Sequence, residues 1–135
     1  MSIAKWKFYD LLDRNGNNLI TAWVNSLPSS KEVRDRLDQR ILFLKQLPIT
    51  TRLDLPQARF LHGKAKGLVE IRFKAGGVER RPLGCLGPGK GEVTLLIGAY
   101  EQNKELRPPG IINTALGRIP LIYQKGRIEE HVLFR

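Results

Sequence analysis

The sequence contains very little cysteine and histidine, which limits the kinds of site that it can build. Cys85 is the only cysteine, so an intramolecular disulfide and a thiolate zinc site are both excluded. His62 and His131 are the only histidines, and no cluster of carboxylates surrounds either of them in the sequence. We therefore expect no metal site and no cofactor.

Long apolar runs are also missing. No stretch approaches the roughly 18 apolar residues of a membrane span, and residues 1–7 lack the uninterrupted apolar core of a signal peptide. We therefore expect a cytoplasmic protein with no membrane partner. A length of 135 residues suits one domain over residues 1–135, large enough to bury a core without metal or disulfide support.

Acidic residues are scarce relative to basic ones. The chain has 23 Lys and Arg against 13 Asp and Glu, a formal net charge of +10. Residues 59–91 alone hold eight basic and two acidic residues, net +6, so most of the excess lies in this middle part. Such a charge attracts nucleic acid, a ribosome surface or anionic lipid. The alternative interpretation is a solvated basic face that keeps the protein soluble.

Residues 69–74 alternate between apolar and charged side chains. Val69, Ile71 and Phe73 are apolar, and the positions between them and after them are charged. Because side chains on a strand point to opposite faces with a period of two, the apolar set can seal a core while the charged set lies on an open face. We look for function on that charged face.

The remaining patterns predict an α+β fold. Residues 3–12 suit a strand, and Asn18 can cap a short helix near residues 19–26. Ser29 and Glu32 form a capping box for a second helix of about 17 residues that ends before Pro48. An antiparallel meander should follow, with strands at 58–63, 68–75, 78–86 and 92–100.

The end of the chain is expected to be helical. After a polar stretch, the sequence 108–110 suits the start of a helix that Pro120 breaks or kinks, and residues 121–134 indicate helix or coil. The predicted fold is a twisted antiparallel sheet of four to five strands. The two N-terminal helices and the C-terminal helix pack over one face, and the other face is basic.

Residues 84–90 match the spacing of a phosphate-binding P-loop up to its lysine. The next residue is Gly91, where a P-loop requires Ser or Thr for Mg²⁺. Residues 92–97 indicate a strand, whereas a P-loop leads into a helix whose amides face the phosphates. We therefore interpret residues 84–91 as a hairpin loop without nucleotide binding.

Several short segments resemble the RelE/HigB toxin superfamily, specifically its phage-derived Gp49-like branch. The resemblance covers nearly the whole chain and depends on the order and spacing of the segments. They are Phe8-Tyr9-Asp10, Gly16-Asn17, Trp23 to Pro28, Gly67 to Arg72, Gly76-Gly77, Arg80-Arg81, Pro108 and Ala115.

The resemblance implies a RelE-like toxin of a type II toxin-antitoxin pair. Such a protein would enter the ribosomal A site, cut mRNA without a metal, and be held in check by a helix-turn-helix antitoxin. In that chemistry the 2′-hydroxyl attacks the adjacent phosphate, so the site must stabilise negative charge, accept a proton and deliver one. A second hypothesis keeps the fold without the chemistry: a non-catalytic RNA- or ribosome-binding protein, or a relative that inhibits a partner such as DNA gyrase.

Arg72 and Arg81 are the main catalytic candidates, because they match the positions at which the family's arginines face the RNA-binding side of the sheet. The alternative is that they are surface arginines paired with Glu70 and Glu79, and exposed pairs of this kind contribute at most about 1 kcal/mol. Arg80 should point away from Arg81 if the strand is regular, so we expect only one of the two to serve the catalytic site.

Proton transfer has weaker candidates. Tyr100 ends a predicted strand and His131 lies near the C-terminus, where several relatives carry a catalytic His or Tyr, but core packing and an exposed histidine are the competing interpretations. Glu101 could serve as a general base, and His62 is a further, less favoured candidate. The residues expected to bind RNA phosphates are Lys64, Lys66, Lys74, Arg80 and Lys104.

Overall fold

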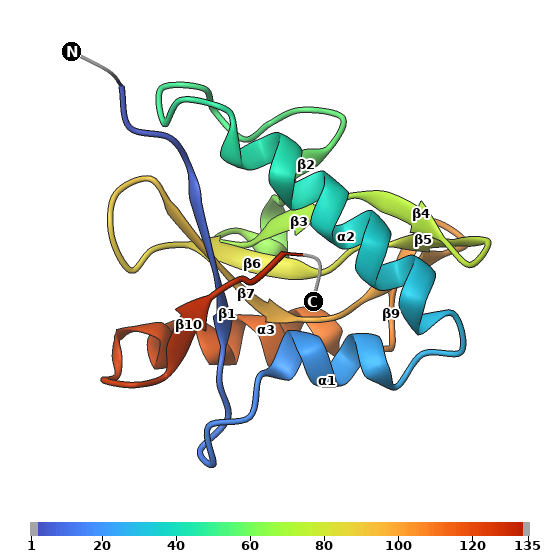
Figure 1. Ribbon diagram of the computed structural model, residues 1–135. Coiled ribbons are helices and arrows are strands. Elements are labelled where there is room, and N and C mark those ends of the chain that lie inside the picture. The colour runs from blue at the N-terminus through green and yellow to red at the C-terminus, as the bar shows by residue number, and fades with distance from the viewer. Residues whose placement is uncertain (1–2, 134–135) are drawn as a thin grey trace.

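The computed structural model describes residues 3–133 and has a mixed α+β architecture (Figure 1). Within that range the α-helices are α1 (Leu19–Asn25), α2 (Ser30–Lys45) and α3 (Ile111–Arg118), and the 3₁₀ helices are η1 (Gly63–Ala65) and η2 (Ile119–Tyr123). The strands are β1 (Lys7–Leu11), β2 (Ala58–Phe60), β3 (Val69–Ile71), β4 (Phe73–Ala75), β5 (Val78–Arg80), β6 (Leu83–Leu86), β7 (Glu92–Ile97), β8 (Tyr100–Gln102), β9 (Glu105–Arg107) and β10 (Ile128–Glu130).

The strands form two sheets that share three stretches of chain. One sheet has the order β10-β1-β7-β6-β3-β2, and the other has the order β4-β5-β8-β9. Each long strand expected from the sequence is divided at a bend, so that 68–75 becomes β3 and β4, 78–86 becomes β5 and β6, and 92–100 becomes β7 and the start of β8. Hydrogen bonds continue through the bend, from the Ile71 amide to the Pro82 carbonyl and from the Arg81 amide to the Ala99 carbonyl.

The predicted antiparallel pairing is confirmed for the strands from β2 to β9, but the prediction of a single sheet of four to five strands is wrong, because the structure has sheets of six and four strands. β1 lies parallel to β7, in contrast to the other pairings of this sheet. β10 pairs antiparallel with the other side of β1, within the tail that was expected to be helix or coil. Strands β9 and β10 have three residues each, too few for a period-two pattern to be recognised.

Helices cover both faces of the six-stranded sheet. On one face, Phe8 and Leu95 pack in the same cluster as Leu37 of α2, and on the other, Leu96 packs with Ala115 of α3. The expectation that all helices lie on one face and leave the other basic is therefore wrong for this sheet. Residues 93–96 are buried in succession, as is usual for a strand with both faces covered.

The predicted cap of α1 and the burial of the apolar positions of the central strand are confirmed, whereas the open face expected for its charged positions is wrong for Glu70, which is 8% exposed. Asn18 caps α1, since its side-chain oxygen accepts a hydrogen bond from the Thr21 amide at 2.9 Å. Ile71 and Phe73 are buried beneath α2, in one cluster with the other apolar residues of the alternation, Val69 and Ala75. Pro120 ends α3, after which the chain continues as η2.

The capping box at the start of α2 is not formed. The Ser29 side chain makes no capping hydrogen bond, and Glu32 accepts a hydrogen bond from the amide of Gly76 instead. Gly76 lies in the turn between β4 and β5, so Glu32 ties the first turn of α2 to this hairpin rather than capping its own helix.

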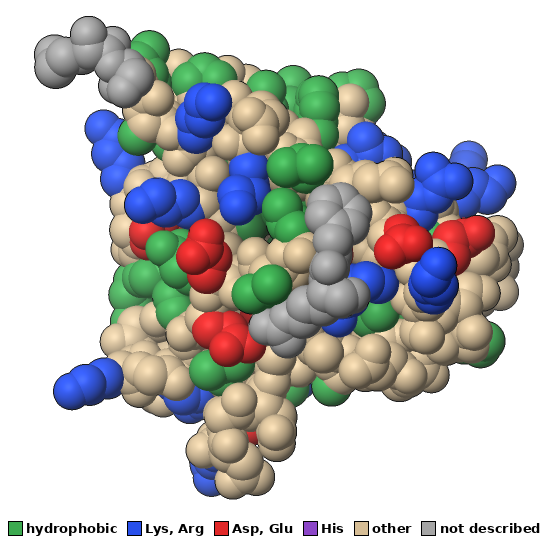
Figure 2. All heavy atoms as spheres, viewed as in Figure 1, with side chains coloured by type: hydrophobic (Ala, Val, Ile, Leu, Met, Phe, Trp, Pro, Cys, Tyr) green, Lys and Arg blue, Asp and Glu red, His purple; other side chains and the backbone are tan. Residues whose placement is uncertain are grey.

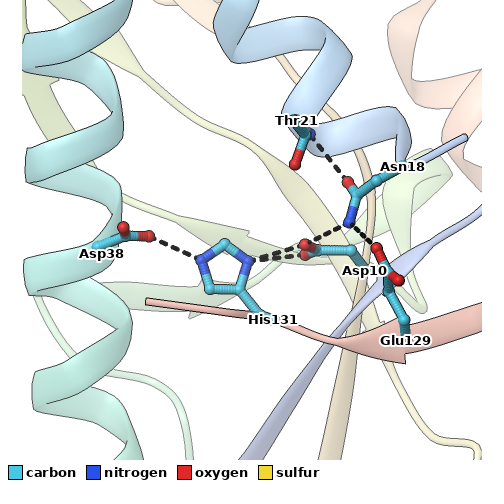
Figure 3. A network of polar contacts seen from close by, with 6 residues as sticks. All are labelled: Asp10, Asn18, Thr21, Asp38, Glu129 and His131. Atoms are coloured by element: carbon cyan, nitrogen blue, oxygen red, sulfur yellow. Dashed lines mark hydrogen bonds and ion pairs between the residues drawn. The ribbon is translucent and has the colours of Figure 1, made fainter. Parts of the chain in front are cut away.

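A buried charged network joins the C-terminal segment to the rest of the fold (Figure 3). His131 is 2% exposed and lies between Asp10 of β1 and Asp38 of α2. Its Nδ1 lies 2.9 Å from both Asp10 oxygens, and its Nε2 lies 2.8 Å from Asp38 Oδ1. Asn18 extends the network by donating to Asp10 Oδ2 and to Glu129 Oε1, each at 2.9 Å. One imidazole therefore connects β10, β1 and α2.

The geometry favours a protonated His131. A neutral imidazole donates from one nitrogen only, whereas the imidazolium donates to both carboxylates. Burial alone would lower the pKa of His131, but the hydrogen bonds to Asp10 and Asp38 raise it from 6.5 to about 9. The positive charge is thus retained at neutral pH in the interior.

This network predicts that the free energy of unfolding falls as the pH becomes alkaline. The contribution of His131 should be complete below the unfolded pKa of 6.5 and lost as the pH rises through the folded pKa of about 9. A shift of this size corresponds to about 3 kcal/mol. Urea unfolding between about pH 6 and about pH 10 should show the loss in the native protein and not in His131→Gln, which should be less stable at the lower pH.

The exposed His62 provides the matched control, because His62→Gln removes a histidine outside the network. That variant should keep the native pH dependence. A native protein whose free energy of unfolding stays constant across this pH range would contradict the charged network.

Candidate functional site

Two arginines occupy the bend between the sheets. Arg72 lies between β3 and β4, and Arg81 follows β5. The Nε atoms of Arg72 and Arg81 lie 3.3 Å and 3.9 Å from the same oxygen of Glu70, Oε1. The structure thus brings the two main sequence candidates together around one carboxylate.

Arg81 is held within a cluster of acidic side chains. Its Nη2 lies 3.2 Å from Glu79 and 3.9 Å from Glu101, and its Nη1 donates to the Arg80 carbonyl at 3.0 Å. Arg81 Nε has no hydrogen-bond partner within residues 3–133, since 3.9 Å to Glu70 allows only an ion pair. Arg81 is paired with Glu70 and Glu79, as the alternative interpretation predicted. That interpretation also made Arg81 a surface residue, which is wrong because Arg81 is 5% exposed.

Glu70 differs from an ordinary surface carboxylate. It is 8% exposed, and burial raises its pKa above the usual range, while Arg72 and Arg81 partly oppose that effect. The charge of Glu101 raises the pKa further. A carboxyl group that holds a proton more readily than usual, next to two guanidinium groups, is suited to accepting and releasing a proton.

Arg72, Arg81 and Glu79 line a groove between α2 and the edge strand β4. A hollow of about 300 Å³ adjoins one of about 400 Å³ that shares Arg40, Phe73 and Lys74 with it. We call the combined surface the α2–β4 groove; it is lined by Arg36, Gln39, Arg40, Pro56, Arg59, Arg72, Phe73, Lys74, Glu79 and Arg81. Six basic side chains and one acidic side chain form this lining.

The surface around the groove carries both signs of charge. Cross-strand pairs place Arg59 beside Glu70, and Lys74 and Glu101 beside Glu79. Figure 2 shows basic and acidic side chains next to one another over β4, β5 and the start of α2. The groove therefore has a net positive lining with carboxylates nearby, but α2 forms one of its walls, so it is not the helix-free basic face that was expected.

The sequence did not single out Arg40 or Arg59, which the structure places in the groove lining. Arg40 Nε is buried without a hydrogen-bond partner in the described part of the chain, and burial lowers the pKa of its guanidinium group. A usable signal was the four-residue spacing of Arg36 and Arg40, which places both on one side of the helix. The three residues of β2 offered no comparable signal for Arg59.

The other predicted residues are spread over the molecule. Lys74 is exposed and lines the groove, whereas Lys64, Lys66 and Lys104 are exposed and are not among its lining residues. Arg80 and Tyr100 line a separate hollow, so Arg80 and Arg81 do serve different surfaces.

His131 and Cys85 are both buried outside the groove. His131 is enclosed by its network with Asp10 and Asp38, so its role in this structure is to hold the fold together. Burial raises the pKa of the Cys85 thiol to about 11, so this side chain is a poor nucleophile.

Two absences concern residues 3–133 only. No three His, Cys, Asp or Glu side chains in this range are grouped so that they could hold a metal ion, and no helix in it is long and apolar enough to cross a membrane. No family model, curated protein or solved structure matches the chain.

The groove predicts a measurable affinity for polyanions that depends on Arg40. Each phosphate contact on a single strand contributes about 0.7 to the slope of log affinity against log salt, so Arg40→Gln should lower the slope by about that amount. Fluorescence anisotropy with a labelled single-stranded RNA measures it. Arg34→Gln, on the same helix and outside the groove lining, is the matched control. Equal slopes for both variants would contradict the groove as a phosphate-binding surface.

Proposed function

We propose that this protein is a toxin of the RelE/HigB type, a ribosome-dependent endoribonuclease that cuts mRNA without a metal at the α2–β4 groove. The observation that carries the proposal is the convergence of Arg72 and Arg81 on the buried Glu70 beside a groove with a positively charged lining. The sequence resemblance and the α+β architecture support the same proposal. A RelE-like fold is part of it.

The cluster supplies two of the three tasks of RNA cleavage. Glu70 accepts the proton of the 2′-hydroxyl. The 2′-oxygen forms a bond to phosphorus, and the bond from phosphorus to the 5′-oxygen breaks. Arg72 and Arg81 stabilise the extra negative charge on the phosphoryl oxygens. The products are a 2′,3′-cyclic phosphate and a 5′-hydroxyl.

The third task is protonation of the leaving 5′-oxygen. Within residues 3–133, no Tyr, His or Cys lines the groove. We therefore assign the proton donor to the ribosome-bound complex in the A site, which agrees with a nuclease that depends on the ribosome. A helix-turn-helix antitoxin would inhibit by covering the groove.

The second hypothesis, a non-catalytic RNA- or ribosome-binding protein, has a specific observation in its favour. Arg72 and Arg81 are paired with three carboxylates, and Tyr100 and His131 lie outside the groove. A surface of that kind can bind RNA or a ribosome without cutting. A gyrase inhibitor of the same fold belongs to this hypothesis as well.

Induced expression separates the two hypotheses. The nuclease should stop growth and shorten translated mRNA, and Arg72→Gln should lower the cleavage rate by about a hundredfold because one charge-stabilising donor is lost. Arg72 is suited to this test because its side chain is 27% exposed and its ion pair within the described chain is with Glu70. Cleavage is measured by mapping mRNA ends after induction.

Two further variants sharpen the result. Glu70→Gln should abolish cleavage while RNA affinity is kept or increased, because a negative charge beside Arg72 and Arg81 is removed. Arg14→Gln, in the exposed turn before α1, should behave like the native protein. Growth arrest with intact mRNA would reject the nuclease in favour of the binding protein.

A further inference from the structure

An exposed aromatic side chain continues the helical wall of the α2–β4 groove. Phe43 of α2 is 44% exposed, so close to half of its surface is open to solvent. Arg36, Gln39 and Arg40 are the residues of α2 that line the groove. Phe43 follows them by seven, four and three residues, and residues at these spacings share one side of a helix. The ring of Phe43 therefore lies one helical turn beyond Arg40 on the groove side.

The other large exposed apolar residue of α2 lies on a different side of the helix. Leu42 is 40% exposed, which is close to the exposure of Phe43. Each residue turns an α-helix by about 100°, so Leu42 lies roughly 160° around the helix from Arg40, whereas Phe43 lies roughly 60° from it. The two neighbours thus expose similar apolar surface, and Phe43 is the one that lies on the groove side.

The charges along α2 favour a polyanion at the end of the groove where Phe43 lies. Near the start of the helix, Glu32 and Asp35 line a hollow together with Arg36, so carboxylates lie at this end. Residues 39–53 contain no Asp or Glu, and their basic residues are Arg40, Lys45 and Arg52. A negatively charged strand that leaves the groove is therefore attracted along the second half of α2, past Phe43.

A nucleotide has two parts that match these two side chains. Its phosphate pairs with a guanidinium group, and the flat face of an unpaired base stacks on an aromatic ring. Single-stranded RNA offers both parts, whereas the bases of a duplex are already stacked and paired. An acidic protein segment would match the charge of Arg40, but it brings no base to Phe43. Single-stranded RNA is therefore the ligand that uses both residues.

We propose that Phe43 is a stacking platform for an unpaired RNA base next to a phosphate that Arg40 holds. This role rests on the proposed function, because it takes RNA as the ligand of the α2–β4 groove. It adds that the RNA is single-stranded there and that its path runs beyond the groove along α2. Since every base has a face that can stack, Phe43 contributes affinity and does not select a sequence.

Fluorescence anisotropy with a short labelled single-stranded RNA measures the contribution of Phe43. Phe43→Ala should weaken binding by at least about fivefold, which is the lower end of the effect of one base stacked on an aromatic ring. Phe43→Tyr keeps the ring and should keep the affinity. Leu42→Ala is the matched control, because it removes a similarly exposed apolar side chain from the other side of the helix, and it should bind like the native protein.

A second probe separates contact with the base from contact with the backbone. It is the same strand with abasic riboses in place of its nucleosides, so that the phosphates remain. The native protein should bind the abasic strand at least about fivefold more weakly, and Phe43→Ala should lose clearly less on the same change, because its stacking contact is already absent. Phe43→Ala should also keep the native salt dependence, which Arg40→Gln lowers.

The outcomes distinguish the stacking platform from the groove itself. Native affinity of Phe43→Ala for the intact strand, or equal losses by this variant on the intact and abasic strands, would overturn the platform; the second result would indicate contact with the backbone. The groove would stand in both cases if Arg40→Gln still lowers the salt dependence. Intact mRNA after induction would reject the nuclease and leave the platform in place, whereas no binding of either strand by the native protein would overturn the platform together with the groove.

Discussion

The bend at which three neighbouring strands pass from one sheet to the other determines where the charged side chains of this protein lie. Arg72, Pro82 and Gly98 occupy it, one on each stretch of chain. Pro82 has no amide to donate, so the ladder is interrupted there, while its carbonyl still accepts from Ile71 at 3.0 Å. The two strands thus remain joined at the bend by this single hydrogen bond.

The groove and the separate hollow lined by Arg80 and Tyr100 both adjoin this bend. On one side, Arg72 and Arg81 meet at Glu70, and the edge strand β4 borders α2 to form the groove. On the other side, Gly98 admits the Trp23 ring beside the separate hollow. The pairing register is the same on both sides of the bend, so Arg72 stands opposite Arg81 and on the same face as Glu70, and this register accounts for their convergence.

The electrostatics of the groove depend on the protonation of Glu70. When Glu70 is ionised, it offsets part of the charge of Arg72 and Arg81, and a phosphate must compete with it for their donors. When Glu70 gains a proton, its oxygens become weaker acceptors and the two guanidinium groups are available to a phosphate. A proton taken from a 2′-hydroxyl would thus release charge-stabilising donors at the moment when the phosphate gains negative charge.

Much of the local structure could be predicted from the sequence, because it depends on near neighbours. The apolar positions of the alternation at 69–74 and the Asn18 cap are examples, and the hairpin loop expected at 84–91 is present but begins only after β6, which ends at Leu86. The parallel pairing of β1 with β7 and the clamp around His131 could not be predicted, because Asp10, Asp38 and His131 meet only after the chain has folded. The same holds for the candidate site. The alternation of the strand pointed to Arg72, whereas Arg40 joins the groove only through the packing of α2 on β4.

The shape of the groove therefore also depends on the position of α2. Polar contacts hold this helix in place, in addition to its buried side chains. Glu32 binds the Gly76 amide at the start of the helix, and Asp38 binds His131 near its middle. Arg36 lies between these two contacts, and Arg40 lies two residues beyond the second. These contacts fix the position of the helix from which Arg36 and Arg40 extend to the groove lining. The buried histidinium, distant in sequence from every groove residue, thus acts on the groove by holding the helix that forms one of its walls.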